Sequence, residues 1–478
     1  MSEITPFRKW FILLGPVLAL VMWLVPHPEV ISDKGWITIA CMVWMLTWWI
    51  SETIPVAVTA LLPLILFPIT GIFTVQEVCS PYGSSPIFLF MGGFIIAMAM
   101  EKWNLHKRIA LNMIRLTGTD ARGIILGFML ATALLSMWIS NTATAVMMIA
   151  IVQPTISLLF EKSDENEEDK NRFALCLLLG IGYAASIGGI ATIIGTPPNV
   201  VMVGIMQKMT GIEVSFFKWM LACTPLMLLL LTACYFLLTR LMFPFKMKRF
   251  AHSEEAIKHE MEQMGKMNPQ ESMVAGVFGF TALLWIFNQP LQHIPGLQFL
   301  DDTSIAMMGG LLLFIVPVKG KWLMEWNDTK NLQWGILILF GGGLALAKAL
   351  EHTGVIDLLA SLANSFKGIN VYLLVIILTA ISLLLTEIMS NVALATIMVP
   401  VVIGIANGIG VNPVSFALPV TIATSYGFMM PISTPPNAIV YATGYIRMKH
   451  MIRAGFWLDM IGLVLVSVFI VSVFDWVF

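Results

Sequence analysis

Two short polar segments lie inside long apolar stretches of this sequence. They read Ser-Asn-Thr at 140–142 and Ser-Asn-Val at 390–392, with no Lys or Arg nearby. Burying hydroxyls and amides in hydrocarbon is costly unless something binds them. Such groups offer oxygen ligands to cations and N–H or O–H donors to anions. One copy could be a helix-packing device, but two copies favour a symmetric binding site.

A second motif, Thr-Pro-Pro-Asn, also occurs twice, at 196–199 and 434–437. Proline lacks an N–H and clashes with the preceding turn, so two in succession should interrupt a helix and leave carbonyls near 193–196 and 431–434 unpaired. Freed carbonyls and hydroxyls suit a hard, weakly charged cation. A plain proline kink is the alternative, but two repeated breaks favour a site.

An anion at these motifs would need partial positive charge. Helices that begin after the polar segments or after the prolines present free N–H groups and the positive end of the helix dipole. Asn141 and Asn391 add amide donors and Thr142 adds a hydroxyl, but no arginine is available within the motifs. A doubly charged anion would therefore rely on co-bound cations, which predicts cation coupling.

Other reactive residue types give weaker signals. Glu387 stands where the first copy has Met137, and it could deepen a cation site, carry a proton or be a structural acid satisfied by neighbouring hydroxyls. The five Cys form no CxxC pair, and the seven His lie mostly at the ends of apolar runs or in loops. We therefore expect no enzyme, no cofactor and no transition metal.

The composition identifies the elements that must hold these motifs. The 478 residues are 58% hydrophobic and only 12% charged, which is typical of a polytopic membrane protein of the all-α class. Eleven apolar runs of spanning length are present, near residues 9–25, 36–50, 54–69, 86–100, 173–194, 219–243, 272–288, 303–317, 334–350, 414–431 and 454–476. We therefore predict eleven transmembrane helices, the first of them uncleaved.

Two further apolar stretches, 123–160 and 371–405, carry the Ser-Asn motifs at their middle. Each is long enough to enter and leave the membrane, and irregular backbone at membrane depth is tolerated where it lines a cavity. We predict two re-entrant helical hairpins with the polar segments at their tips. Two ordinary spans joined by a polar turn are the alternative.

The two halves of the chain are repeats. Residues around the first polar segment match those around the second at a separation of 250, and the proline motifs match at 238. The charged loop 161–172 accounts for the missing twelve residues. The predicted units are a first transmembrane helix (1–28), repeat 1 (29–245), a cytoplasmic linker (246–269) and repeat 2 (270–478). An odd number of spans per repeat gives two inverted repeats, as in secondary transporters.

The basic residues set the orientation. With the N-terminus in the cytoplasm and the C-terminus outside, all but five of the 27 Lys and Arg fall on the cytoplasmic side or in its loops, as the positive-inside rule requires. The basic linker then faces the cytoplasm, and we expect no nucleic-acid partner. Amphipathic segments at 103–116 and 355–364 should lie along the membrane plane; they either hold a moving bundle against a frame or simply join spans.

With these motifs, the sequence resembles the divalent anion:sodium symporter family, which includes bacterial dicarboxylate and mammalian citrate and dicarboxylate transporters. The paired Ser-Asn segments, the Leu-Thr-Glu at 385–387 and the two proline motifs carry the resemblance, which extends over nearly the whole chain. It implies a homodimer in the lipid bilayer that works by an elevator movement, here expected in a bacterial inner membrane.

The resemblance also implies ligands. The first sodium site maps to Ser136, Ser140, Asn141 and Gly195, and the second to Thr386, the carbonyl of Met389, Asn391 and Ser433. The substrate site maps to Asn141, Thr142, Thr196, Pro197, Asn391, Val392, Thr434 and Pro435. Val392 departs from the family's threonine and loses its hydroxyl, so it bears on substrate preference.

The expected function is secondary active transport that couples inward sodium movement to uptake of C4-dicarboxylates such as succinate. Three alternatives stay open within the same fold: a sodium-independent dicarboxylate exchanger, a citrate transporter and a sulfate transporter. An intramembrane enzyme or a channel is disfavoured, because paired broken helices suit an occluded site.

Overall fold

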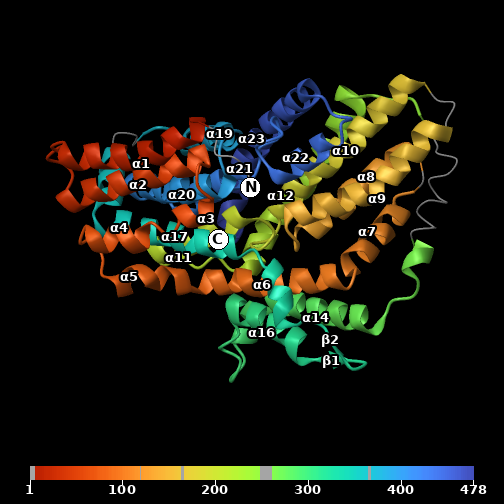
Figure 1. The fold of residues 1–478 in the computed structure, drawn as a ribbon, viewed down its shortest axis with the longest axis horizontal. Coiled ribbons are helices and arrows are strands. Elements are labelled where there is room, and N and C mark those ends of the chain that lie inside the picture. The colour runs from red at the N-terminus through yellow and green to blue at the C-terminus, as the bar shows by residue number, and fades with distance from the viewer. Residues whose placement is uncertain (1–5, 119, 163–165, 248–260, 364–367, 478) are drawn as a thin grey trace.

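The computed structural model describes residues 6–118, 120–162, 166–247, 261–363 and 368–477, which are mostly helical. Most of the predicted linker (248–260) lies outside the described residues. Figure 1 shows a bundle of long helices, with α14, α16 and a two-residue β-hairpin on one side of it.

The helices of the first half are α1 (Pro6–Leu24), α2 (Asp33–Ser51), α3 (Val56–Thr59), α4 (Pro63–Ile69), α5 (Val75–Cys79), η1 (Ser80–Gly83), α6 (Ser85–Lys102), α7 (Leu105–Leu116), α8 (Ala121–Ser136), α9 (Asn141–Lys162), α10 (Glu167–Gly189), α11 (Pro197–Thr210), α12 (Phe216–Phe236) and η2 (Leu237–Met242).

The elements of the second half are α14 (Pro269–Ile286), α15 (Asn288–Gln292), α16 (Asp302–Ile315), β1 (Pro317–Val318), β2 (Lys321–Trp322), η3 (Trp326–Asn331), α17 (Trp334–His352), α18 (Val355–Ala363), α19 (Val371–Thr386), α20 (Asn391–Ile409), α21 (Val414–Thr424), α22 (Pro435–Ala442) and α23 (Met448–Val477).

Each polar segment separates two helices that contact each other. In the first half α8 ends at Ser136 and α9 begins at Asn141, and in the second half α19 ends at Thr386 and α20 begins at Asn391. Helices α8 and α9 pack together, as do α19 and α20. Both polar segments are therefore the tips of helical hairpins, and the intervening backbone is too short for anything but a turn.

The proline motifs do not interrupt a helix in the way that their sequence suggests. Helix α10 ends at Gly189 and α21 at Thr424, well before the prolines, and the prolines begin the next helices, α11 and α22. Proline is favoured at the first helical position because its missing N–H would have no partner there. The irregular backbone therefore covers residues 190–196 (the first loop) and 425–434 (the second loop).

The apolar helices of the structure differ in length. In the described part of the chain, six helical segments are by length and composition able to cross a membrane: Val75–Lys102, Glu167–Gly189, Phe216–Met242, Trp334–His352, Asn391–Ile409 and Met448–Ile470. Other apolar helices, among them Trp10–Leu24 and Asp302–Ile315, are shorter, so the prediction of eleven spans stays a prediction. The predicted run at 54–69 is divided into α3 and α4 at Pro63, and the run at 414–431 is helical only to Thr424. Both differences occur where proline or a loop ends the helix early.

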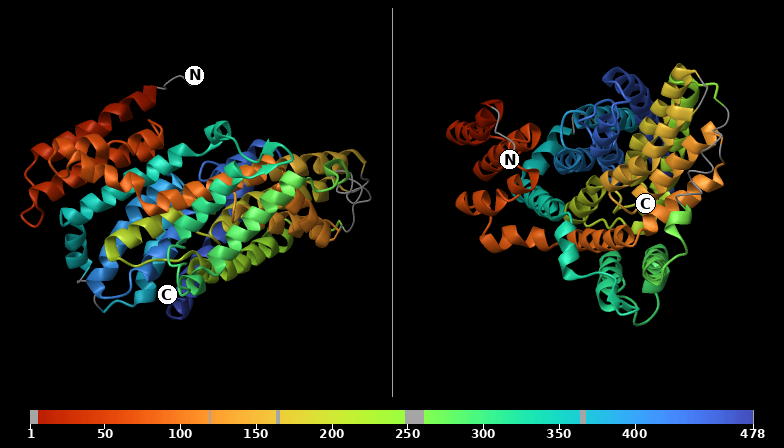
Figure 2. Two further views of the ribbon diagram at one scale, coloured as in Figure 1. Left: turned by 90° about the horizontal axis from the view of Figure 1, so that it is seen from below. Right: turned by 45° about the vertical axis from the view of Figure 1, so that its right-hand side comes forward.

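The hairpins and broken helices of the two halves interlock. Helix α10 packs against α8 of its own half and α22 of the other, and α11 packs against α20 and α21. A second group lies beside them: α6 packs on α14 and α16, and α17 packs on α3 and α11. Helices α1 and α2 pack on each other and lie at one end of the molecule (Figure 2).

The amphipathic helix α7 is fixed to the second half by an ion pair. Arg108 donates from Nε to Oε1 of Glu271 over 2.5 Å and from Nη2 to Oε2 over 3.1 Å. Glu271 lies in the first turn of α14, where its backbone N–H is capped by Asn268. A bidentate pair of this kind fixes geometry as well as charge, so the helix before the first hairpin is tied to α14.

Candidate functional site

The first hairpin tip and the first loop bring four oxygen-bearing groups together. One end of the Asn141 amide lies 2.6 Å from Oγ of Ser136, 3.2 Å from the carbonyl oxygen of Ala185 and 3.3 Å from that of Gly195. Ser136 Oγ is also 2.7 Å from the Ala185 carbonyl oxygen. We call these four residues the first oxygen cluster.

The chemistry of this cluster fits a cation. The serine hydroxyl has one proton and two acceptors within reach, so it cannot satisfy both. Either end of the Asn141 amide can occupy the central place. With nitrogen there, the amide donates to its neighbours; with oxygen there, four oxygens converge, and such a set of carbonyl, hydroxyl and amide oxygens is what Na⁺ binds at unwound helices.

The second hairpin repeats this arrangement. Thr386 Oγ1 lies 2.9 Å from Oδ1 of Asn391 and 2.5 Å from the carbonyl oxygen of Thr424, so its single proton has two acceptors within reach. Ser433 Oγ likewise lies between two carbonyls, 2.8 Å from that of Gly427 and 2.7 Å from that of Met430. We call Thr386, Asn391, Thr424 and Ser433 the second oxygen cluster.

Both loops are braced by the asparagine that ends the proline motif. Asn199 donates from Nδ2 to the carbonyls of Gly189 (3.1 Å) and Thr192 (2.8 Å). Asn437 donates in the same way to Gly427 (2.8 Å) and Met430 (3.1 Å). Each amide therefore holds together the two ends of one loop. Sequence reasoning missed this role, although Asn follows Pro-Pro in both motifs and is the signal that could have shown it.

Glycine is required where the first loop meets the hairpin tip. A Cβ on Gly189 would lie 2.5 Å from Oδ1 of Asn141, and a Cβ on Gly195 would lie 2.4 Å from the carbonyl oxygen of Gly189. Both distances are shorter than any side chain tolerates. The two glycines therefore allow the loop backbone to approach the asparagine amide.

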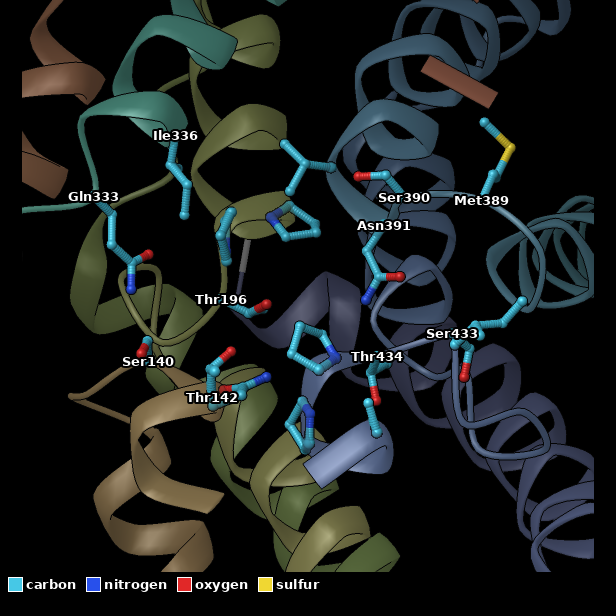
Figure 3. Close-up of a pocket in the computed structure, with 18 of the residues that line it drawn as sticks. Ser140, Thr142, Thr196, Gln333, Ile336, Met389, Ser390, Asn391, Ser433 and Thr434 are labelled. Carbon is cyan, nitrogen blue, oxygen red and sulfur yellow. The ribbon is translucent and has the colours of Figure 1, made fainter. Parts of the chain in front are cut away.

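The two clusters flank one cavity of about 630 Å³. In Figure 3, Ser140 and Thr142 lie on one side of it and Ser390 and Asn391 on the other, with Thr196 between them. Of the residues predicted from the sequence, the cavity is lined by Ser140, Asn141, Thr142, Gly195, Thr196, Pro197, Met389, Asn391, Val392, Ser433, Thr434 and Pro435. Ser136 and Thr386 are fully buried (0% exposed) behind the two asparagines.

Four helices begin at the cavity. Asn141, Pro197, Asn391 and Pro435 are the first residues of α9, α11, α20 and α22, and all four line the cavity wall. The N-terminal end of a helix carries partial positive charge, so these ends favour an anion. No Lys or Arg of the described residues lines the cavity, and Glu52 is its one charged side chain there.

Part of the cavity wall comes from helices outside the hairpins and the proline motifs, which the sequence did not assign to the site. It is formed by the end of α2, by α6 and by the start of α17, through Ser51, Glu52, Phe90, Phe94, Gln333 and Ile336. Glu52 caps α2 in the left-handed region at φ 46°. The 250-residue repeat includes Phe90, which matches Phe340, but it gives no reason to place this apolar side chain at a polar site, and no motif singles out the other positions.

Glu387 does not line the cavity. Its side chain is 4% exposed and accepts hydrogen bonds from the backbone N–H groups of Met429 (2.9 Å) and Met430 (3.0 Å). Its carboxyl also lies against that of Asp459 in α23. The sequence left three roles open for Glu387, and the structure provides hydrogen-bond partners for one of them, the structural acid. Those partners are backbone amides rather than hydroxyls.

Comparisons with known proteins identify the family of this chain. The family described as "Sodium:sulfate symporter transmembrane region" matches residues 7–478. The chain is 40% identical over 462 residues to the sodium-dependent dicarboxylate transporter SdcS of Staphylococcus saprophyticus, covering 95% of this chain and 89% of the relative. It is 39% identical over 464 residues to SdcS of Staphylococcus aureus strain USA300, with the same coverage.

Two solved structures share the fold at low sequence identity. The YdaH transporter of Alcanivorax borkumensis has a TM-score of 0.54 at 13% identity and covers 99% of both chains. MtrF of Neisseria gonorrhoeae, described as one of a class of antimetabolite efflux pumps, has a TM-score of 0.57 at 12% identity and covers 98% of this chain and 94% of its own.

Proposed function

Since this chain belongs to the sodium:sulfate symporter family, we propose that it is a secondary active transporter that couples inward sodium movement to uptake of C4-dicarboxylates such as succinate. The observation that carries this proposal is the pair of oxygen clusters on either side of one cavity. Relatives named sodium-dependent dicarboxylate transporters, at 39–40% identity, support the substrate class.

The cavity explains why such a transporter needs sodium. A dicarboxylate brings two negative charges to a wall that has four helix N-termini, hydroxyls and amides but no Lys or Arg among its described residues. Helix ends and neutral donors offset only part of that charge. Two cations beside the asparagines, one in each cluster, supply the remainder.

Asn141 and Asn391 couple the two ligands. With sodium in a cluster, the amide oxygen faces the cation and the amide nitrogen is left to face the cavity, where it can donate to a carboxylate. In Figure 3 the Asn391 amide nitrogen points toward the middle of the cavity. In the opposite orientation the nitrogen of Asn141 lies within hydrogen-bond distance of Ser136, Ala185 and Gly195, and its oxygen would face and repel the anion. Sodium therefore orients the donor that the substrate needs.

The proposed architecture is that of an elevator in the bacterial plasma membrane. It has eleven spans, two re-entrant hairpins (123–160 and 371–405) and inverted repeats at 29–245 and 270–478, after a first helix in 1–28. The interlocking hairpins and broken helices form the moving part, and the second group of helices forms the frame, in a homodimer with a cytoplasmic N-terminus and an external C-terminus. The charge distribution and the packing of the two groups support this assignment.

The proposed ligands are those predicted from the sequence. Sodium is held by Ser136, Ser140, Asn141 and Gly195 in one half and by Thr386, Met389, Asn391 and Ser433 in the other. The dicarboxylate contacts Asn141, Thr142, Thr196 and Pro197 on one side and Asn391, Val392, Thr434 and Pro435 on the other. The shared lining of the cavity supports both sets.

Uptake by the purified protein in proteoliposomes tests the proposal. We expect labelled succinate to accumulate under an inward sodium gradient and not when choline replaces sodium. Because each ligand must raise the affinity for the other by the same factor, succinate should also bind more weakly in potassium than in sodium by calorimetry. Equal affinity in both salts, with exchange across the membrane, would establish the sodium-independent exchanger. Preference for citrate or sulfate in competition would change the substrate class but keep the coupling.

A further inference from the structure

Each hairpin tip is hydrogen-bonded to its loop at the same pair of repeat-related positions, and we call this contact the tie. In the first half the pair is 137 and 192, and in the second half it is 387 and 430. These positions are separated by 250 and 238 residues, the spacings of the polar segments and of the proline motifs. The tie is present in both halves, but different chemical groups form it.

In the first half the loop side chain donates to the tip backbone. Thr192 donates from Oγ1 to the carbonyl oxygen of Met137, and Thr192 is fully buried (0% exposed). Met137 directly follows Ser136 of the first oxygen cluster. The carbonyl of Thr192 also accepts the Asn199 brace at 2.8 Å, so one threonine joins the tip to the braced loop.

In the second half the direction is reversed, and the loop backbone donates to the tip side chain. The amides of Met429 and Met430 donate to the two oxygens of Glu387. Glu387 directly follows Thr386 of the second oxygen cluster. The carbonyl of Met430 accepts from Ser433 and from the Asn437 brace, so one carboxylate again joins tip and loop.

From this correspondence we propose that Thr192 and Glu387 are positioning residues of the two cation sites. Neither residue lines the cavity, so neither touches the substrate. Each holds the hydroxyl ligand of a hairpin tip at a fixed place relative to the carbonyls of the facing loop. The inference rests on the proposed function, because it takes the two oxygen clusters to be sodium sites.

The second tie is stronger than the first. It has two hydrogen bonds to one carboxyl group, where the first has a single hydrogen bond between a hydroxyl and a carbonyl. Removing Glu387 leaves the part-buried N–H groups of Met429 and Met430 without this partner, so the second site should lose more sodium affinity than the first.

The test compares sodium dependence in full-length variants reconstituted in liposomes. The variants are Thr192→Val, Glu387→Gln, which keeps one acceptor oxygen, and Glu387→Met, which places the first-half residue in the second half. We expect the half-saturating sodium concentration to rise about threefold for Thr192→Val and about tenfold for Glu387→Met, with Glu387→Gln between them. The KM for succinate at saturating sodium should stay within about twofold of wild type, as expected for residues that do not touch the substrate.

A matched control separates positioning from simple loss of a buried polar group. Thr379 in α19 is also 0% exposed, and its hydroxyl has no protein partner among the described residues. Thr379→Val should leave the half-saturating sodium concentration unchanged. Sodium-induced stabilisation against thermal unfolding gives a readout independent of transport, because a ligand that binds the folded state raises Tm by an amount that grows with the ratio of its concentration to its Kd. The rise in Tm on adding sodium should be smaller in all three test variants. If Glu387→Met fails to fold, the sodium dependence of Glu387→Gln tests the role of Glu387.

Two results would overturn the inference. A lower kcat with unchanged sodium dependence would make the ties purely structural, and a raised succinate KM at saturating sodium would place these groups on the anion instead. The proposed function fails separately, since a wild-type protein that transports succinate equally well in choline would refute it before any variant is compared.

Discussion

The two hairpin tips share the hydroxyl and the amide of their oxygen clusters and differ in the residues beside them. In both, a buried hydroxyl (Ser136 or Thr386) contacts the amide of an asparagine (Asn141 or Asn391) and a backbone carbonyl near the C-terminal end of a neighbouring helix, α10 or α21. These groups sit at the same places in both halves, although serine replaces threonine. The requirement for oxygen ligands explains why either hydroxyl serves.

The differences lie one and two residues away. Thr142 of the first tip is replaced by Val392, which lines the cavity without a hydroxyl. Trp138 of the first tip packs at 5.0 Å against Phe278 and is stacked at 6.2 Å on Trp285, both in α14. Its counterpart Ile388 is 64% exposed and lines the cavity. The symmetry of this site is therefore a symmetry of its two oxygen clusters, whereas the neighbouring cavity wall and the contact with α14 are asymmetric.

Replacing the asparagine of either hairpin tip with alanine should impair transport to the same extent. Asn141→Ala and Asn391→Ala each remove one cation ligand and one carboxylate donor, and charged hydrogen bonds contribute about 1.5–3 kcal/mol each. We expect sodium-driven succinate uptake to fall at least about 100-fold in either variant. Uptake is measured in proteoliposomes, with protein recovery and unfolding temperature as the check on folding. Near-normal uptake by one variant would show that only one half binds ligands.

Replacing either amide with a carboxylate should separate the effect on sodium binding from the effect on dicarboxylate binding. Asn141→Asp and Asn391→Asp keep an oxygen for sodium but present a negative charge to the dicarboxylate. We expect succinate affinity to fall about 10- to 100-fold, while sodium still raises the unfolding temperature. Asn407→Asp, at an exposed position of α20, provides the control and should change neither quantity. If sodium stabilisation disappears as well, the amide nitrogen rather than its oxygen faces the cluster.

The smallest effect is expected where the two tips differ in the anion contact. Val392→Thr restores the hydroxyl of the first tip with little change in volume, and a net hydrogen bond contributes about 0.5–1.5 kcal/mol. We expect affinities for succinate, malate, fumarate and citrate to change by about two- to tenfold relative to one another, with sodium dependence unchanged. Competition against labelled succinate measures this. An unaltered rank order and unaltered affinities would mean that the side chain at 392 does not contact the substrate.

Repetition determined how much of this molecule could be predicted from its sequence. The hairpin tips and proline motifs stand out because polar or helix-breaking residues recur at fixed spacings in apolar stretches, and the structure brings them to one cavity. The mistakes concerned helix ends. The predicted interruptions are present as the loops 190–196 and 425–434, but each loop precedes the prolines, which begin the next helix.

The unpredicted parts depend on tertiary contacts with no local pattern. Residues such as Glu52 and Gln333, at the ends of α2 and α17, also line the cavity, and no sequence period or motif marks them. The tie between Thr192 and Met137 joins a side chain to a backbone carbonyl 55 residues away. Such a contact depends on how α10 packs against α8, and the sequence specifies that packing only through the whole fold.

Two oxygen clusters facing one cavity also bear on how steep a substrate gradient this protein can maintain across the membrane. With one sodium ion in each cluster, as proposed, two sodium ions and one dicarboxylate dianion would form a neutral complex, so its passage would move no net charge and the membrane voltage would add nothing. A single net charge would have added about 2.3 kcal/mol per 100 mV. All of the concentrating power then comes from the sodium gradient, where a tenfold gradient contributes about 1.4 kcal/mol per ion and supports roughly hundredfold accumulation for two ions. A cell with a collapsed electrical potential but an intact sodium gradient would still accumulate its carboxylates.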